Sequence, residues 1–425
     1  MTSHDLFDPE YAAALDARFA TVSRRDQFLI PQHDGADMAY FVGNSLGLQP
    51  RAAADAVGEI LSKWATLGVD GHFTGDTRWL TYHRLVRDGM ARLVGAQPEE
   101  VVAMNTLTVN LHLLMASFYR PTQERRAILV EKGAFPTDTY AVRSQVEFHG
   151  MDPATDLIEL EPDADGWFSD DSIRHAIESN ASRLALVLWP GVQYRTGQVF
   201  DMQQIAQWAH DAGAMVGFDC AHSVGNIAMN LHDSNADFAV WCHYKYVNSG
   251  PGAVAGAFVH LRHADKDLPR LAGWWGNRQE TRFLMEPMFD PADGAEGWQL
   301  SNPPVLALAP LRASLELFDS VTESDRIEFA RSMTDYLFDL VDTHFSHLIE
   351  SVTPRDYARR GCQVSLRIKA GRTKGRELFE FMESRGVLGD WREPDVIRIS
   401  PVPMYNTHAD LLRFASVVRE WCNAQ

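Results

Sequence analysis

The middle of the chain alternates short apolar runs with stretches of helical pattern. The apolar runs lie at 127–131, 184–189, 214–219, 238–241 and 255–261, and helical patterns follow the first two at about 140–145 and 202–212. Apart from the terminal Glu131 and Asp219 and from His260, the runs are continuously apolar instead of alternating with polar residues. Such runs are typical of strands buried on both faces of a mostly parallel sheet. We therefore expect an α/β domain in which helices cover the sheet.

After about Pro304 the pattern changes. Helices are expected at about 306–318, 325–345, 374–384 and 408–423, and strands at 362–368 and 396–400. This mixture predicts a smaller α+β domain over residues 305–425. We expect the large domain to cover 41–304 and the segment 1–40 to pack with the small domain.

The charge balance of the chain limits the kinds of molecule that it is expected to bind. The 425 residues carry 39 basic and 57 acidic side chains, a net charge of −18. This excess of acid, without any basic block, argues against binding to nucleic acid or to an anionic membrane surface. No run approaches the roughly 20 apolar residues of a membrane span. The acidic N-terminus has no apolar core, so no signal peptide is expected.

The cysteines indicate the compartment. Four are scattered along the chain and none forms a CxxC pair, which fits a reduced, cytoplasmic protein. Cys220-Ala221-His222 offers only two candidate metal ligands without companions, so we expect no metal site.

Two polar residues follow apolar runs. Lys245 stands between two tyrosines after the run 238–241, where we expect the end of a buried strand, and Asp219 ends the run 214–219. A buried ammonium group is costly unless it is paired or used chemically. This pair suits pyridoxal phosphate (PLP), because the lysine would bond covalently to the cofactor and the carboxylate would keep the pyridine nitrogen protonated. The alternative is a lysine that reaches solvent and a helix-capping aspartate.

Three further segments carry weaker signals. Residues 105–115 begin with capping residues and become apolar, which predicts a helix whose N-terminus can hold a phosphate, or an ordinary capped core helix. Phe135 and Asp138 flank the start of another predicted helix. They would place a ring and a carboxylate beside a flat cofactor, or serve as a core residue and a cap. Residues 43–50 predict only a turn before a helix that begins near Arg51.

Taken together, these segments resemble the kynureninases, PLP enzymes of the aspartate aminotransferase fold type, fold type I. The resemblance runs from about residue 40 to residue 406. It depends on Gly43–Pro50, Asn105–Met115, Phe135–Asp138, Phe218–His222, Tyr244–Tyr246, Gly273–Gly276, Ser301–Pro304 and Arg398–Pro403. It implies a large domain with a mostly parallel seven-stranded sheet and a smaller α+β C-terminal domain.

The resemblance also implies roles for single residues. The catalytic residues would be Lys245, Tyr244 and Asp219. The cofactor would contact Leu107, Thr108, Phe135, Asp138, Asp219, His222, Tyr244, Lys245, Trp274 and Asn302. The substrate would contact Asn44, Ser45, His72, Asn302 and Arg398. Arg398 would clamp the α-carboxylate, which needs the two-pronged geometry of arginine, whereas the alternative is a surface arginine. Trp274 and Asn302 would come from the partner subunit of a homodimer.

The implied reaction is hydrolysis of the Cβ–Cγ bond of an amino-acid substrate, L-kynurenine or L-3-hydroxykynurenine. It yields L-alanine and anthranilate or 3-hydroxyanthranilate, in tryptophan catabolism and NAD biosynthesis. Lys245 would move the proton at Cα, and Tyr244 would return one to Cβ. His72 and Asn302 favour the hydroxylated substrate, because both can bond a ring hydroxyl.

Several alternatives stay open. One is a kynurenine with further ring substituents in a biosynthetic pathway, and another is a PLP aminotransferase. A cysteine desulfurase would need a mobile cysteine, which Cys362 in a strand does not provide, and a PLP-binding regulator would need a DNA-binding segment. Two residues depart from the family pattern. Pro190 offers no hydroxyl to a cofactor, and His243 stands where a serine is common, so it would either touch the phosphate or pack in the core.

Overall fold

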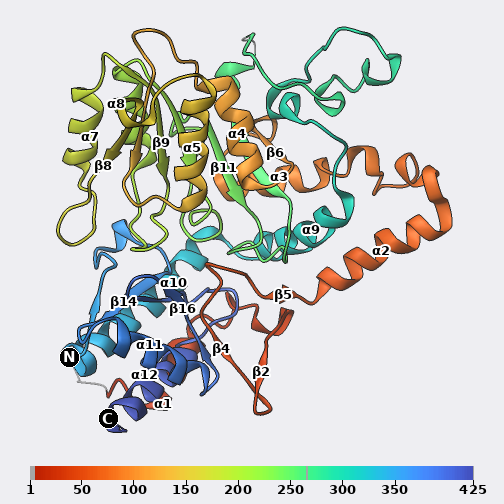
Figure 1. Cartoon of the computed structure of the whole chain (residues 1–425). Helices are drawn as coiled ribbons and strands as arrows, with labels where there is room; N and C mark the ends of the chain where they lie inside the picture. The colour runs from red at the N-terminus through yellow and green to blue at the C-terminus, as the bar shows by residue number, and fades with distance from the viewer. Residues whose placement is uncertain (1–4, 265–266, 425) are drawn as a thin grey trace.

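The computed structural model describes residues 5–264 and 267–424, which form a larger and a smaller body (Figure 1). The larger body contains a seven-stranded sheet in the order β6-β12-β11-β10-β9-β7-β8. Its strands are β6 Val101–Ala103, β7 Ala127–Glu131, β8 Leu157–Leu160, β9 Leu184–Pro190, β10 Met215–Asp219, β11 Phe238–Cys242 and β12 Ala255–Val259. Strand β12 pairs antiparallel with β6 and β11, and the other neighbouring pairs among these strands are parallel. The predicted mostly parallel sheet is confirmed.

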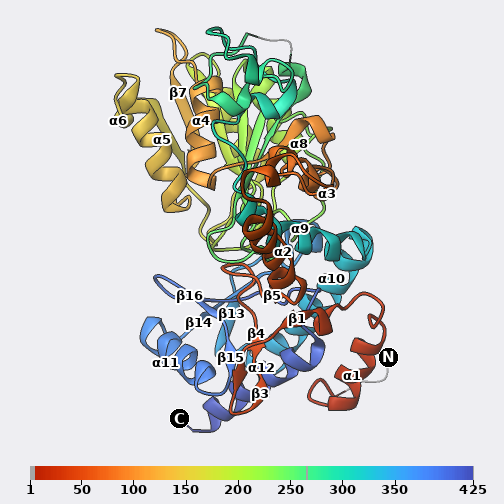
Figure 2. The ribbon, with the colours of Figure 1, turned by 90° about the vertical axis from the view of Figure 1, so that its right-hand side faces the viewer.

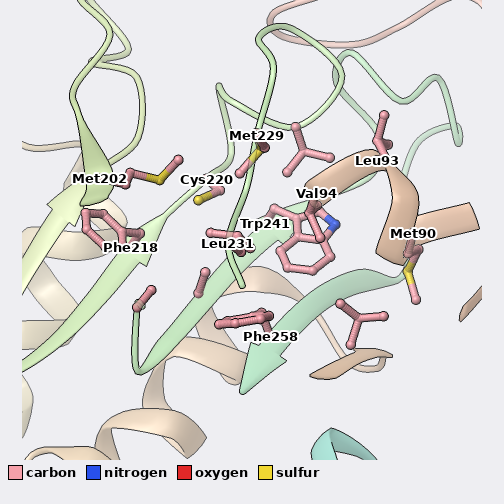
Figure 3. Close-up of a cluster of buried hydrophobic side chains, with 14 of the residues drawn as sticks. Met90, Leu93, Val94, Met202, Phe218, Cys220, Met229, Leu231, Trp241 and Phe258 are labelled. Atoms are coloured by element: carbon pink, nitrogen blue, oxygen red, sulfur yellow. The ribbon is translucent and has the colours of Figure 1, made fainter. Parts of the chain in front are cut away.

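Helices cover both faces of this sheet. One face packs against α4 Leu107–Phe118 and α5 Pro136–Phe148. The other packs against α3 Arg84–Val94, α7 Asp170–Ser179, α8 Met202–Asp211 and α9 Val305–Asp319. Figure 3 shows this second layer, where Met90 and Val94 of α3 lie near Trp241 and Phe258 of neighbouring strands. Burial on both faces explains why the strands are apolar at successive positions.

The smaller body is an antiparallel sheet with helices. Its strands have the order β13 Ile349–Ser351, β14 Val364–Ile368, β17 Val396–Ile399 and β16 Asp390–Arg392. Its helices are α10 Glu323–Leu340, which continues as a π-helical turn over Val341–Phe345, α11 Arg372–Glu383 and α12 His408–Asn423. The expected C-terminal helices and strands are all present, with bounds shifted by a few residues.

The N-terminal segment lies against these C-terminal elements (Figure 2). Helix α1 Pro9–Ala17 packs on α12, and β4 Ala39–Tyr40 pairs in parallel with β15 Val387–Leu388. The short strands β1 Phe28–Leu29, β2 Gln32–His33, β3 Ala36–Asp37 and β5 Gln49–Pro50 form two hydrogen-bonded pairs, β1 with β5 and β2 with β3. Helix α2 Ala52–Leu67 then leads back to the larger body along α9. The exact domain boundaries at 40/41 and 304/305 stay a prediction.

The expectation that Lys245 ends a strand is wrong. Strand β11 ends at Cys242, opposite Ala255 of β12. The ladder stops there because the His243 side chain, and not a strand backbone group, bonds the carbonyl of Val254. Lys245 therefore lies in the loop three residues beyond the strand. Sequence analysis also missed β6 and β8, which are short strands, and α3 and α7, although both helices bury apolar residues at helical spacing.

A buried ionic group joins helix α3 to the loop before α9. Glu296 accepts two hydrogen bonds from Arg84, at 3.0 and 2.8 Å, and lies 3.5 Å from Nε2 of His83. Burial alone would raise the pKa of Glu296, but the nearby His83 and the paired Arg84 lower it to about 2. The carboxylate is therefore stabilised in its charged form by folding.

Within the described ranges, no helix combines the length and the apolar character that a membrane crossing requires.

Candidate active site

A cavity lies at the carboxyl ends of the parallel strands. Glu131, Pro190 and Asp219 are the last residues of β7, β9 and β10, and all three line it. In open α/β sheets this edge is where ligands bind. The complete lining is Thr106, Leu107, Thr108, Glu131, Phe135, Thr137, Asp138, Pro190, Val192, Tyr194, Asp219, Ala221, His222, Tyr244 and Lys245.

Lys245 projects into this cavity between aromatic rings. It is 8% exposed, and its Nζ atom lies 5.7 Å from the ring centre of Phe135 and 6.0 Å from that of Tyr244. The loop that carries Lys245 packs on the turn at Gly47, whose N–H donates to the carbonyl of Tyr244. A Cβ atom at Gly47 would lie 2.3 Å from the carbonyl oxygen of Lys245. The glycine is thus required for the turn to approach the lysine loop.

Two carboxyl groups, Asp219 and Asp138, lie close together in the cavity. Asp219 Oδ1 accepts a 2.7 Å hydrogen bond from the backbone N–H of Ala221. Burial raises the pKa of Asp219, and the charge of Lys245 opposes that rise. Burial raises the pKa of Asp138 well above its ordinary value, and the adjacent Asp219 carboxylate adds to the effect. Two like charges this near one another cannot both be stable without a positive group between them.

His222 completes this polar wall. Burial lowers the pKa of His222 well below its ordinary value, and Lys245 adds to the shift, so the imidazole is neutral. Its Nδ1 atom and Oδ1 of Asp138 are buried and have no hydrogen-bond partner in the described part of the chain. Buried polar atoms of this kind are usually satisfied by a ligand or by water.

The start of helix α4 forms another wall. Thr106 is its N-cap residue, and the Thr106 side chain makes no capping hydrogen bond within the described chain. The preceding Asn105 has a positive φ of 48°, and its side chain donates to Asn110 at 3.0 Å, which fixes the approach to the helix. The free N–H groups of the first turn and the helix dipole favour an anion at this place.

These groups fit PLP. The helix start suits a phosphate, Phe135 offers a ring face, the buried carboxyls suit a pyridine nitrogen, and Lys245 suits an aldehyde. The unpartnered atoms of His222 and Asp138 supply polar positions that a cofactor would satisfy.

Arg398 lies beside the cavity. It is fully buried on β17, opposite Ser365 of β14 and Asp390 of β16, so it is not a surface arginine. Its Nη1 donates to the carbonyl of Tyr194 at 2.7 Å, and its Nη2 pairs with Asp390. Its Nε has no partner within the described residues. Tyr194 lines the cavity, so Arg398 contacts a residue of the cavity wall without lining the cavity itself.

The remaining predicted site residues do not line the cavity; they are Asn44, Ser45, His72, Trp274 and Asn302. Asn44 is buried, and its Nδ2 donates to Gln363 at 3.1 Å, while Ser45 is half-buried beside it. The His72 ring packs edge-on against Trp79, Trp274 is 48% exposed with its Nε1 on the carbonyl of Arg282, and Asn302 is exposed.

The structure settles the role of His243 and places Pro190. His243 is fully buried, with Nδ1 2.7 Å from the carbonyl of Val254 and Nε2 accepting a 2.7 Å bond from Trp241. Both ring nitrogens are therefore used within the core. Pro190 lines the cavity but brings no polar group.

Sequence analysis missed Tyr194 and Glu131. Glu131 had a usable signal, since it ends an apolar run as Asp219 does. Tyr194 had none, because it lies in an irregular loop.

Comparison with known proteins assigns the family. Residues 39–371 match the family model Aminotransferase class-V, and residues 329–418 match the Kynureninase C-terminal domain. A kynureninase from Xanthomonas campestris pv. campestris (strain B100) is 62% identical over 421 residues, 99% of each chain. The chain belongs to the kynureninase family. A kynureninase from Xanthomonas oryzae pv. oryzae (strain KACC10331 / KXO85) is 60% identical over 421 residues, 99% of this chain and 100% of the other.

Solved structures agree on the fold. A cysteine desulfurase from Thermococcus onnurineus NA1 superimposes with a TM-score of 0.75 at 16% identity, covering 91% of this chain and 95% of the other. One from Escherichia coli gives 0.75 at 17% identity, covering 96% and 98%. At such low identity these likenesses concern the fold alone. The predicted kynureninase resemblance and PLP fold type I are confirmed.

Proposed function

We propose that this kynureninase family member is a PLP-dependent hydrolase that cleaves the Cβ–Cγ bond of L-kynurenine or L-3-hydroxykynurenine. The products are L-alanine and the corresponding anthranilate. The observation that carries the proposal is the cavity that joins Lys245, Asp219 and the start of α4, in a chain 62% identical to a kynureninase. When bound, PLP supplies an electron sink for charge that develops on the substrate.

Each residue of the cavity has a separate role in this proposal. Lys245 would hold the cofactor, and its amine would move the proton at Cα of the substrate. Asp219 would hold a proton on the pyridine nitrogen. The N–H groups at the start of α4 would bind the phosphate. Phe135 would offer its ring face, and the neutral His222 would donate or accept a hydrogen bond without adding charge.

Arg398 and Tyr244 act on the substrate. After Nη1 of Arg398 bonds Tyr194 and Nη2 bonds Asp390, Nε is left without a partner among the described residues, and a guanidinium edge that includes Nε–H matches a carboxylate. Burial raises the pKa of Tyr244 above its ordinary value, so its hydroxyl keeps its proton. Tyr244 is therefore suited to deliver a proton to Cβ after the carbon–carbon bond breaks.

The decisive experiment is incubation of the purified, PLP-loaded protein with L-kynurenine. We expect fluorescent anthranilate and alanine in equal amounts, and no product with Lys245→Ala. Keto acid in place of anthranilate, together with an aminated cofactor, would instead favour an aminotransferase. Parallel assays with L-3-hydroxykynurenine and other ring-substituted kynurenines identify the preferred substrate.

A homodimer with shared sites forms the second part of the proposal. Helix α2 extends away from the sheet (Figure 1), and Leu61 and Trp64 on it are about half exposed or more. The loop before α9 also exposes large apolar residues, among them Phe283, Leu284, Met285 and Met288. Exposed apolar surface of this extent is typical of an interface. His72, Trp274 and Asn302 have no place in the cavity of their own chain, so we assign them to that of a second copy.

Mixed dimers test this arrangement. A Lys245→Ala chain and a Trp274→Ala, Asn302→Ala chain are each expected to be inactive alone. If the residues are shared, a statistical mixture regains about a quarter of wild-type activity, because each mixed dimer holds one intact site. No recovery, with mixed dimers confirmed by mass, contradicts sharing.

The proposed setting is the cytoplasm and the catabolism of tryptophan. None of the four cysteines, all within the described chain, is paired, as expected in a reducing compartment. Fractionation of the source cells tests this.

A further inference from the structure

Glu131 is a buried carboxyl group that the proposed reaction does not use. It is 2% exposed, it ends β7, and it lines the same cavity as Lys245. Its Oε2 atom is buried and lacks a hydrogen-bond partner among the residues that the structure describes. An ionised carboxylate with a bare oxygen in such a place is unfavourable.

The side-chain amide of Gln193 can take only one orientation toward Glu131. Gln193 Oε1 accepts hydrogen bonds from the backbone N–H groups of Arg195, at 2.6 Å, and Thr196, at 2.8 Å. Its Nε2 therefore faces Oε1 of Glu131, at 3.4 Å, and donates to it. Since Oε1 is an acceptor, a proton on this carboxyl group belongs on Oε2.

The charges around Glu131 also favour a protonated carboxyl group at this position. The other titratable groups that line the cavity are Asp138 on α5, Asp219 on β10, His222 after it, Tyr194 after β9, and Tyr244 and Lys245 after β11. Strand β9, between β7 and β10, ends in Pro190 and adds no polar side chain. Burial already favours the neutral form of Asp138, but ionised carboxylates at both Glu131 and Asp219 would still outnumber the single ammonium group of Lys245 in a cavity that must receive an anionic phosphate.

We propose that Glu131 is a positioning residue of the PLP site that works as a neutral carboxylic acid, so that Asp219 carries the negative charge opposite the cofactor ring. The inference rests on the proposed function for the identity of the cofactor.

The electrostatics of the cavity support the neutral form. Burial raises the pKa of Glu131 to about 8, and Asp219 adds to the rise while the bond from Gln193 opposes it. Above that pH Glu131 would ionise, place a second negative charge beside Asp138 and Asp219, and compete for the positive charge of Lys245.

Glu131→Gln tests the inference, because glutamine keeps the shape and stays neutral. At neutral pH the variant is expected to bind PLP and to turn over substrate within about threefold of wild type. In the PLP-loaded wild type, the cofactor absorption should change with a midpoint near pH 8. That change should disappear in Glu131→Gln and persist in the matched control Glu159→Gln, an exposed carboxyl on the adjacent strand β8.

Two results would overturn the inference. One is a loss of more than about 100-fold in PLP affinity for a folded Glu131→Gln at neutral pH, since it would mean that the charge is needed. The other is an unchanged alkaline titration in that variant.

A second measurement is independent of variant folding and of kynurenine cleavage. Wild-type protein labelled with ¹³C at its glutamate carboxyls should show an infrared band of a protonated glutamic acid at neutral pH that fades through the same alkaline range. Absence of the band refutes the neutral form. A wild type that shows the band but does not cleave kynurenine refutes the proposed function alone.

Discussion

Replacing Arg398 by lysine separates the charge of the proposed substrate clamp from its geometry. The guanidinium group is fully buried and bonded to the carbonyl of Tyr194 and to Asp390. Lysine keeps one positive charge but offers a single ammonium group, which cannot reach these two partners and also present two parallel N–H groups to a carboxylate. The variant should therefore hold the α-carboxylate by one contact instead of two.

The expected fall in kcat/KM follows from the loss of one of the two contacts. A hydrogen bond to a charged group is worth about 1.5–3 kcal/mol, so the loss of one lowers kcat/KM about 10- to 150-fold. We expect KM to rise and kcat to fall together, because a loosely held substrate also loses its orientation over the cofactor. Asp390 keeps its 2.9 Å bond from Arg392, so it is not left unpaired and the fold should survive.

Steady-state anthranilate fluorescence with L-kynurenine measures the effect, and thermal unfolding checks the fold. Arg367→Lys is the matched control, since Arg367 lies on the neighbouring strand β14 and pairs with Glu350 at 2.6 Å, outside the cavity lining. Its kinetics should match wild type. Wild-type kinetics in Arg398→Lys would refute the clamp, and an equal loss in both variants would show a general effect of sheet stability.

Three further outcomes are expected. Borohydride reduction of the yellow wild type should fix the PLP label on the peptide that contains Lys245, and mass spectrometry should find no labelled peptide in Lys245→Ala. The wild type should prefer 3-hydroxykynurenine over kynurenine by roughly three- to thirtyfold in kcat/KM, and the double change His72→Trp, Asn302→Thr should remove that preference. Equal preference in the wild type would contradict this assignment. Because folding lowers the pKa of Glu296 from 4.5 to about 2, its stabilisation is present above pH 4.5 and is lost as the pH falls through 2. Urea unfolding of Glu296→Gln should show about 2–3 kcal/mol less stability at neutral pH and a flatter acid limb.

The sequence by itself determined the order and type of most main elements, and it singled out Lys245 and Asp219, which the structure brings to one cavity. Runs such as 127–130 and 184–189 are apolar at every position because both faces of these strands are buried, and burial is what hydrophobic patterning records. Lys245 and Asp219 were recognisable because polar residues after such runs are costly without a function.

Only the tertiary structure decided which polar groups meet. Glu131 and Gln193 contact one another across 62 residues of chain, and Arg398 meets a carbonyl 204 residues away. The tautomer and core role of His243 likewise depend on Val254, a partner on the adjacent strand. His72, Trp274 and Asn302 lie outside the cavity of their own chain. Local patterns report burial and backbone preference, whereas these contacts depend on how distant segments are brought together by the packing of the whole sheet.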